Sequence, residues 1–375
     1  MSTRKLIVVK LGTSTLTDEN HALSRPRMLE ITRQLVLLRQ EGFGVVVVTS
    51  GAVSAGREVM AKKRSDRSLP LKQMLASIGQ VRLMHLWSEF FANYRVVVGQ
   101  VLLSRSDFVN RVHYLNIRDT LLTLLSHGVI PIVNENDVVA VKRMRFGDND
   151  TLSALVANLI DADLLALMTD QEGLFTADPR LDPTAKLIPI VAKIEEGHLL
   201  AATGSGTAVG TGGMATKLTA ARLAVESGTE VVIASSLAHD SIIRVAHGET
   251  MGTRFVARHQ PLESRKRWLL AEEPQGGIII DPGAELSLKA RGSSLLPKGV
   301  VQVVGTFNRG ALVDILSNEG HRVAVGLASY SSEELERIIG LHSKEIEKTL
   351  GYSRGDEVVH RDQLTMMRQS HDKSE

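Results

Sequence analysis

The strongest constraint on the fold is an alternation of short apolar runs with longer amphipathic stretches in the first 235 residues. Runs rich in Val, Ile and Leu, typical of buried strands, occur at residues 6–9, 44–48, 95–103, 129–133, 163–170 and 230–234. Stretches with helical periodicity lie between them, at residues 26–40, 70–94, 116–126, 151–160 and 214–227. Because parallel strands need a crossover between them, usually a helix, this order predicts a mostly parallel, open α/β sheet with helices on both faces.

Polar residues stand at the carboxyl ends of the predicted strands. They are Lys10, Ser50, Asn134 and Asp170. Ligands of open α/β sheets bind in the crevice at this edge of the sheet. The shared position therefore predicts that these residues belong to one active site.

Two clusters of Asn and Asp flank the segment from residue 134 to residue 150. The first is Asn134-Glu135-Asn136-Asp137, and the second, thirteen residues on (134 against 147), is Gly147-Asp148-Asn149-Asp150. Either cluster alone is typical of a polar turn. One stands at a strand end and the other at a helix start, where Asp150 is placed to cap the helix. Together they favour a polar pocket that offers carboxylates to a cationic group and amides to a mixed donor and acceptor ligand.

Two further segments suit an anion. Lys10 is followed by Gly12 and by hydroxyl residues, which favours a phosphate at the strand end, although an edge lysine with a turn fits equally well. Residues 204–213 hold five glycines and lead into a helix with Lys217 in its first turn. Such a loop presents backbone N–H groups and a helix N-terminus to an anion, and the alternative is a flexible surface loop. Neither segment is a Walker A loop or a G-x-G-x-x-G motif.

Composition narrows the classes of function. The chain of 375 residues has no cysteine, which excludes disulfides, thiolate zinc sites and a cysteine nucleophile. Its formal charge of +2 is too small to indicate a nucleic-acid binder. The N-terminal apolar run is too short for a signal peptide, and no run approaches the length of a membrane span. We therefore expect a cytoplasmic protein without a membrane segment.

The sequence changes character after about Ser235. A basic stretch that includes Arg265, Lys266 and Arg267 suggests a connection between domains. After it, short apolar runs at residues 278–280, 284–288, 300–304, 311–316 and 323–327 alternate with turn residues, which predicts a small β-barrel. The predicted boundaries are residues 1–255 for the α/β domain, 256–275 for the linker, 276–360 for the barrel and 361–375 for a disordered tail.

Specific motifs connect the chain to a known family. They are VKLGTS at residues 9–14, TSGA at 49–52, NEND at 134–137, GDND at 147–150, LMTD at 167–170 and GTGGMATK at 210–217. The stretch RGSSLLPKG at residues 291–299 is similar to a PUA signature. With these motifs in order, the chain from about Leu6 to about Arg361 resembles the glutamate 5-kinase family in its long form. The resemblance implies an amino acid kinase fold followed by a PUA domain.

The resemblance also implies roles for individual residues. ATP would transfer its γ-phosphoryl group to the side-chain carboxylate of glutamate, between Lys10 and Lys217, with Asp150 orienting both lysines. The implied glutamate site consists of Ser50, Asp137 and Asn149, with Asn134 and Asp148 in support. The implied nucleotide site consists of Lys10, Gly12, Thr169, Asp170, Thr211, Gly212, Gly213, Met214, Ala215, Thr216 and Lys217.

The family chemistry needs little beyond positioning and charge. A carboxylate with a pKa near about 4.3 is already ionised at neutral pH, so it needs no general base. Catalysis should therefore consist of positioning and charge neutralisation. The resemblance implies Mg²⁺ bridging the phosphate oxygens of ATP, without metal ligands supplied by a dedicated protein cage. It further implies a homo-oligomer, inhibition by proline, and functional coupling to glutamate-5-semialdehyde dehydrogenase.

Two alternatives stay open at this stage. The chain could be a sibling kinase that acts on aspartate, acetylglutamate or carbamate. It could also act as an RNA-binding protein through its PUA-like domain, although the near-neutral charge and the full set of kinase motifs disfavour nucleic acid as the main partner.

Overall fold

The computed structural model describes residues 5–60, 68–139, 149–195, 197–198, 213–257 and 274–367. The chain divides into two compact units. The first consists of residues 1–110 and 116–261, and the second of residues 111–115 and 262–375. Most of the predicted linker, residues 258–273, lies outside the described residues.

The first unit is built on an eight-stranded sheet with the order β3-β4-β2-β1-β5-β7-β8-β6. All neighbouring strands are parallel except β7 and β8, which are antiparallel. The strands are β1 (Leu6–Leu11), β2 (Gly44–Val48), β3 (Val98–Leu103), β4 (Ile130–Glu135), β5 (Leu164–Thr169), β6 (Ile190–Val191), β7 (Glu230–Ser235) and β8 (Thr253–Phe255). The prediction of a mostly parallel α/β sheet is confirmed.

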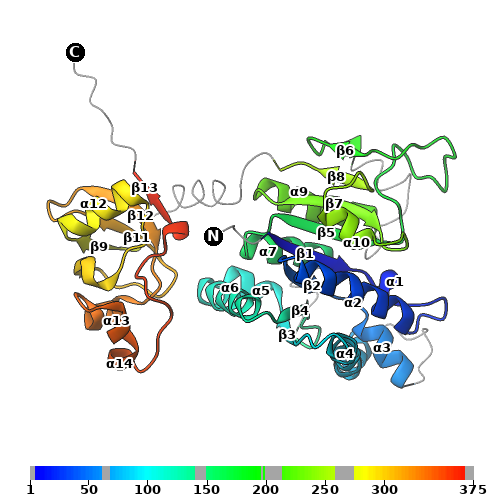
Figure 1. Ribbon diagram of the computed structural model, residues 1–375, viewed down its shortest axis with the longest axis horizontal. Coiled ribbons are helices and arrows are strands. Elements are labelled where there is room, and N and C mark those ends of the chain that lie inside the picture. Colours follow the sequence, from blue (N-terminus) through cyan, green and yellow to red (C-terminus); the bar gives the residue numbers. More distant parts are fainter. Residues whose placement is uncertain are drawn as a thin grey trace, which may run out of the picture. The chain divides into compact units, whose positions relative to one another are not determined.

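Helices cover both faces of this sheet (Figure 1). The described helices are α1 (Thr13–Leu16), α2 (Arg25–Gln40), α3 (Ala52–Val59), α4 (Leu69–Ala92), α5 (Arg105–Val109), α6 (Arg111–Ser126), α7 (Asn149–Leu159), α9 (Met214–Glu226) and α10 (Ser241–Ala246). Ile7, Val9 and Leu11 of β1 join a hydrophobic core with residues of α2, α4 and α10. Because side chains alternate along a strand, Val8 and Lys10 point to the opposite face. Lys10 therefore comes to lie on the face that carries α7 and α9.

The register of the central strands sets the position of the site. In β1, Lys10 pairs with Val48 of β2 on one side and with Leu167 of β5 on the other. Ser50 follows β2 and Asp170 follows β5, so both leave the sheet beside Lys10. Strand β4, which carries Asn134, is the next neighbour of β2. The four polar residues predicted to share one sheet edge therefore follow or end four adjacent strands.

Two glycines allow α3 and α4 to touch backbone to backbone. A Cβ atom at Gly79 would lie 1.8 Å from the carbonyl oxygen of Ala52, and one at Gly56 would lie 1.9 Å from that of Leu75. In a sequence read alone, Gly79 weakens the pattern of a long helix. In the fold, α4 continues through it because only glycine permits this close crossing.

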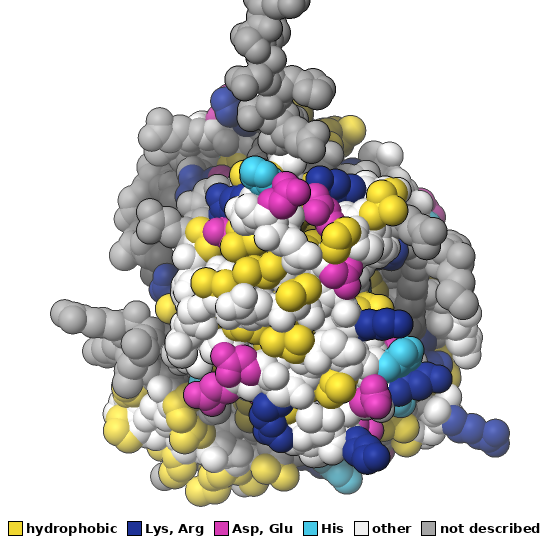
Figure 2. Space-filling model, turned by 90° about the vertical axis from the view of Figure 1, so that its left-hand side faces the viewer, with side chains coloured by type: hydrophobic (Ala, Val, Ile, Leu, Met, Phe, Trp, Pro, Cys, Tyr) yellow, Lys and Arg dark blue, Asp and Glu magenta, His cyan; other side chains and the backbone are white. Residues whose placement is uncertain are grey.

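The second unit contains a five-stranded sheet with the order β10-β9-β11-β12-β13. Its strands are β9 (Gly276–Ile280), β10 (Val300–Val304), β11 (Leu312–Leu316), β12 (Arg322–Leu327) and β13 (Leu364–Met366). Its helices are α12 (Pro282–Arg291), α13 (Ser332–Ile338) and α14 (Ile346–Leu350), with 3-10 turns at Pro297–Gly299, Ser343–Glu345 and Arg361–Gln363. Figure 2 shows a face of this unit on which hydrophobic side chains lie among acidic and basic ones, without one sign of charge dominating.

Two sequence expectations for this unit are wrong. The run at residues 284–288, expected as a strand, lies in α12, because Asp281 accepts a hydrogen bond of 2.7 Å from the Ala284 backbone N–H and Pro282 occupies the first turn. The tail expected to be disordered from residue 361 begins with a 3-10 turn and β13, which pairs with β12. Residues 368–375 lie outside the described residues.

None of the helices within the described residues combines the length and the apolar composition needed to cross a bilayer.

Candidate active site

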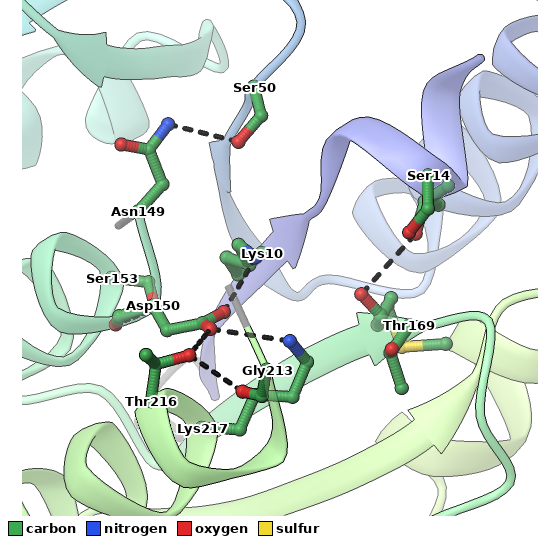
Figure 3. A network of polar contacts seen from close by, with 12 residues as sticks. Lys10, Ser14, Ser50, Asn149, Asp150, Ser153, Thr169, Gly213, Thr216 and Lys217 are labelled. Carbon is green, nitrogen blue, oxygen red and sulfur yellow. Dashed lines mark hydrogen bonds and ion pairs between the residues drawn. The ribbon is translucent and has the colours of Figure 1, made fainter. Parts of the chain in front are cut away.

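The carboxylate of Asp150 joins two buried lysines from different elements. Its Oδ1 atom lies 2.6 Å from the Nζ atom of Lys10 on β1, and its Oδ2 atom lies 3.3 Å from the Nζ atom of Lys217 on α9. All three side chains are buried. Figure 3 shows Asp150 between the two lysines. This group carries a net charge of one positive unit, which suits an anion.

Asp150 lies within the first turn of α7, which begins at Asn149. The sequence predicts a capping role for its side chain, but the described partners of its carboxylate are Lys10, Lys217 and Thr216. Burial alone would raise the pKa of Asp150, but the charges of the two lysines and the hydrogen bonds outweigh it, so the pKa is lowered. Asp150 is therefore ionised at neutral pH and holds both ammonium groups in place.

The first turn of α9 adds a hydroxyl group to the cluster of Asp150 and the two lysines. The hydroxyl of Thr216 lies 2.9 Å from Asp150 Oδ2 and 2.7 Å from the carbonyl oxygen of Gly213, so its hydrogen can serve either acceptor. Gly213 is the residue before α9, and Met214 and Ala215 are half-buried in the first turn. The helix N-terminus, whose first backbone N–H groups have no partner within the helix, thus lies beside Lys217. Thr211 and Gly212 lie outside the described residues.

A second polar group lies where β1 and β5 end. The hydroxyls of Thr169 and Ser14 donate to Asp170 Oδ1 at 3.0 and 3.4 Å. Ser236, which follows β7, donates to the carbonyl oxygen of Thr169 through both its N–H, at 2.7 Å, and its hydroxyl, at 3.0 Å. Gly12 precedes α1, and a Cβ atom there would lie 3.4 Å from Lys10 Nζ. The predicted nucleotide residues that are described therefore surround the end of β1.

A chain of amide hydrogen bonds forms the other side of the site. The Nδ2 atom of Asn149 lies 2.5 Å from the Thr49 carbonyl oxygen, 2.8 Å from Asn134 Oδ1 and 3.0 Å from Ser50 Oγ. Figure 3 shows the side chains of Asn149 and Ser50 facing each other. Because Asn149 and Asp150 are neighbours in sequence, α7 joins this chain to the two lysines. The predicted substrate residues Ser50, Asn134 and Asn149 are thus brought together.

Helix α4 contributes side chains that the sequence alone did not reveal. Gln80 accepts a hydrogen bond of 2.8 Å from Asn134, and Trp87 donates one of 3.2 Å to the hydroxyl of Thr49. Gln73 donates one of 3.1 Å to the carbonyl oxygen of Val138. These three residues are spaced by seven, which is two helical turns, so they lie on one face of α4. Their spacing alone could not have revealed them, because α4 carries several other polar and charged residues.

Of the two remaining predicted substrate residues, the structure describes only one. Asp137 lies half-buried in the turn that follows β4, next to the Val138 carbonyl that Gln73 binds. Asp148 lies outside the described residues. Within the described part of the chain, no three His, Asp or Glu side chains gather closely enough to hold a metal ion.

Comparisons with known proteins match both units. Residues 5–235 match the Amino acid kinase family, and residues 276–350 match the PUA domain. The chain is 48% identical to a protein named glutamate 5-kinase from Deinococcus radiodurans, over 96% of this chain and 99% of that relative. It is 50% identical to one from Herpetosiphon aurantiacus and 48% identical to one from Vibrio vulnificus, each over at least 96% of both chains. The chain therefore belongs to the amino acid kinase family and, within it, to the glutamate 5-kinases.

Proposed function

We propose that this protein transfers the γ-phosphoryl group of ATP to the side-chain carboxylate of L-glutamate, giving L-glutamyl 5-phosphate, the first step of proline biosynthesis. The observation that carries the proposal is the bridge of Asp150 between Lys10 and Lys217, beside a wall of amides. Two buried ammonium groups offer positive charge to a transferring phosphoryl group. The amides offer donors and acceptors to a zwitterion. The names of the relatives support the same reaction.

In the proposed reaction, an oxygen of the glutamate side chain attacks the γ-phosphorus of ATP. The bond from that phosphorus to the oxygen it shares with the β-phosphate breaks, and ADP leaves with the electron pair. No proton moves, because the attacking carboxylate is already ionised. Lys10 and Lys217 would neutralise charge on the transferring group, and Asp150 would hold both lysines in position without a change in its own protonation.

The nucleotide would lie between the ends of β1 and β5 and the start of α9. The backbone N–H groups at the start of α9 and Lys217 suit phosphate oxygens. Thr169 and Asp170 would contact the nucleotide farther from the transferring group. Mg²⁺ would be held mainly by the phosphate oxygens of ATP and by water, as is usual for this ion. When bound with ATP, the ion would supply further neutralisation of phosphate charge.

Glutamate would occupy the side of the site formed by Ser50, Asn134 and Asn149, with Asp137 facing its ammonium group. The NH₂ group of Asn149 already faces three acceptors, which exceeds its two hydrogens. Asn149 would therefore give up one of these partners to bind a carboxylate. Free proline carries the same ammonium and carboxylate pair but no nucleophile, so we propose that it inhibits by competing for this site. We also propose a homo-oligomeric enzyme, functionally coupled to glutamate-5-semialdehyde dehydrogenase.

Turnover of ATP with a panel of carboxylate acceptors tests the proposed reaction, with hydroxylamine added to trap the acyl phosphate. We expect a hydroxamate with L-glutamate and far less with L-aspartate, which is one methylene shorter, because a misplacement of about 1 Å can cost about 10²-fold in rate. Faster turnover with aspartate, N-acetylglutamate or carbamate would overturn the assignment of the substrate.

A further inference from the structure

The amide chain beside the lysines has a fixed direction. At Asn134, the Oδ1 atom accepts a hydrogen bond of 3.0 Å from the backbone N–H of Glu135. At Asn149, the NH₂ group lies 2.5 Å from the backbone carbonyl oxygen of Thr49. A backbone N–H can only donate and a carbonyl oxygen can only accept, so these contacts fix the orientation of both amides.

The same argument fixes the orientation of Gln80. The Oδ1 atom of Asn134 is defined by the backbone, so its other terminal atom is the NH₂ group that donates to Gln80. Gln80 must then present Oε1 to Asn134 and its NH₂ group to the surroundings. This Nε2 atom is buried and has no acceptor within hydrogen-bond distance in the described part of the molecule. By comparison, the nitrogen of Asn149 faces three acceptors.

A buried donor without an acceptor is unfavourable, so such a group in a binding site indicates a ligand oxygen. The chain of contacts starts at Asn149, the neighbour of Asp150, and leads through Asn134 to Gln80 on α4. Gln80 therefore stands at the end farthest along this chain from the two lysines. The side-chain carboxylate of glutamate must reach the lysines, which leaves the α-carboxylate for the opposite end.

We propose that Gln80 is a substrate-binding residue whose Nε2 group donates a hydrogen bond to the α-carboxylate of glutamate. The proposal rests on the proposed function, because it assigns one end of the substrate of that reaction. Gln80 thereby selects amino acids with a free α-carboxylate. Its other terminal atom, bonded to Asn134, holds the donor at the correct angle.

Replacing Gln80 with Glu tests the assignment, because it keeps an oxygen for Asn134 and replaces the free donor with a negative charge. Steady-state kinetics of the full chain would compare L-glutamate with its α-amide, which keeps the side-chain carboxylate but carries an NH₂ in place of one α-carboxylate oxygen. We expect Gln80→Glu to raise the KM for glutamate on the order of 10- to 100-fold. The ratio of kcat/KM for the α-amide to that for glutamate should rise, and the KM for ATP should stay within about twofold of its original value.

Gln40→Glu is the matched control, since it makes the same change of side chain at an exposed residue that ends α2. The ratio between the two substrates should not move in this variant. If Gln80→Glu fails to fold, Gln80→Met, which removes the donor without adding charge, should still raise the KM for glutamate and leave that for ATP unchanged. A folded Gln80 variant with an unchanged KM for glutamate overturns the inference, as does an equal loss with both substrates. If the unaltered chain forms no glutamyl phosphate, the proposed function itself fails, whatever the variants do.

Discussion

Lys10 and Asp150 form a buried ion pair of 2.6 Å between the central strand of the sheet and the first turn of α7. A buried pair of this kind contributes little net stability over an apolar contact, because both charges lose their hydration. Its geometry is nevertheless well suited to phosphoryl transfer, because Lys217 meets the other oxygen of the same carboxylate. The arrangement keeps two ammonium groups close together before any substrate arrives.

Removal of either lysine should affect the chemical step most strongly. We expect Lys10→Ala and Lys217→Ala each to lower kcat by about 10²- to 10³-fold, because each removes a charge from the transferring phosphoryl group. Steady-state kinetics with varied glutamate measure the effect, and the KM for glutamate should change much less. Lys289→Ala, at an exposed ion pair of the second unit, is the control. A raised KM with unchanged kcat in both site variants would contradict the assignment.

Asp150→Asn should destabilise the folded protein at neutral pH by about 3–5 kcal/mol, because it leaves two buried ammonium groups without a counter-charge. The native pKa of Asp150 is lowered, so its ionisation stabilises the fold above the ordinary carboxyl pKa of about 3.9. This contribution is lost as the pH falls through the native pKa. The difference between the variant and the unaltered chain should therefore stay constant from neutral pH down to about pH 5 and shrink below about pH 4, as denaturant titrations at each pH would measure.

Asp182→Asn is the matched control for that experiment. The pKa of Asp182 is also lowered, by side-chain and backbone hydrogen bonds from Thr184, but the residue is only partly buried and has no buried lysine beside it among its described partners. Its replacement should change stability much less at neutral pH. An equal loss of stability in both variants would show that the buried lysines are not the cause.

Gly79→Ala should lower the thermal unfolding midpoint, with a loss of about 1–3 kcal/mol, because its methyl group would overlap the carbonyl of Ala52. The matched control is Gly197→Ala, since a Cβ atom at that position meets no atom within 4 Å. Calorimetry of the two variants provides the comparison. Equal midpoints would mean that α3 and α4 can separate at little cost.

Asp137→Ala should weaken glutamate and proline together and leave the KM for ATP nearly unchanged. The reason is that both amino acids carry an ammonium group that the Asp137 carboxylate can pair with. Inhibition curves with proline at several glutamate concentrations test this. Full sensitivity to proline in a variant with poor glutamate binding would point to a separate regulatory site.

A chain that ends after Ala257 should fold and phosphorylate glutamate, because every described site residue lies in the first unit. The cut must follow β8, because Phe255 is buried and pairs with Val231 of β7. A chain that ends at Met251 lacks β8 and should be markedly less stable, which makes it the control. Circular dichroism and the hydroxamate assay would report on both. A folded but inactive product of the longer chain would show that the second unit is needed for catalysis.

The sequence predicted the site residues at the strand ends, but not those that α4 contributes. Lys10, Ser50, Asn134 and Asp170 could be placed together because parallel strands end at a common edge, whatever the details of packing. Gln80 could not be placed with them, because its contact with Asn134 depends on the rotation of α4 and on the proximity of that helix to β4. Neither property can be read from the apolar periodicity of the helix.

Errors in the second unit have a local cause. The residues from Ala284 to Leu288 alternate between apolar and polar side chains, as strand residues do, and Asp281 with Pro282 is also typical of a turn. The same two residues are a helix start when the backbone after them coils. The short strand Leu364–Met366 could not be predicted from its own residues, because it lies in a mostly polar stretch. Its place in the sheet depends on pairing with β12, which is distant in sequence.

The contact between Gly56 and Gly79 has a consequence for how the site can adapt. At this crossing the backbones of α3 and α4 are in direct contact, so the two helices cannot move closer together there. Ser50 precedes α3, and Gln80 belongs to α4. The crossing of the two helices therefore connects two parts of the predicted substrate site. A smaller amino acid therefore cannot be accommodated by moving these helices closer together. A smaller phosphoryl acceptor would therefore require different side chains in this part of the site.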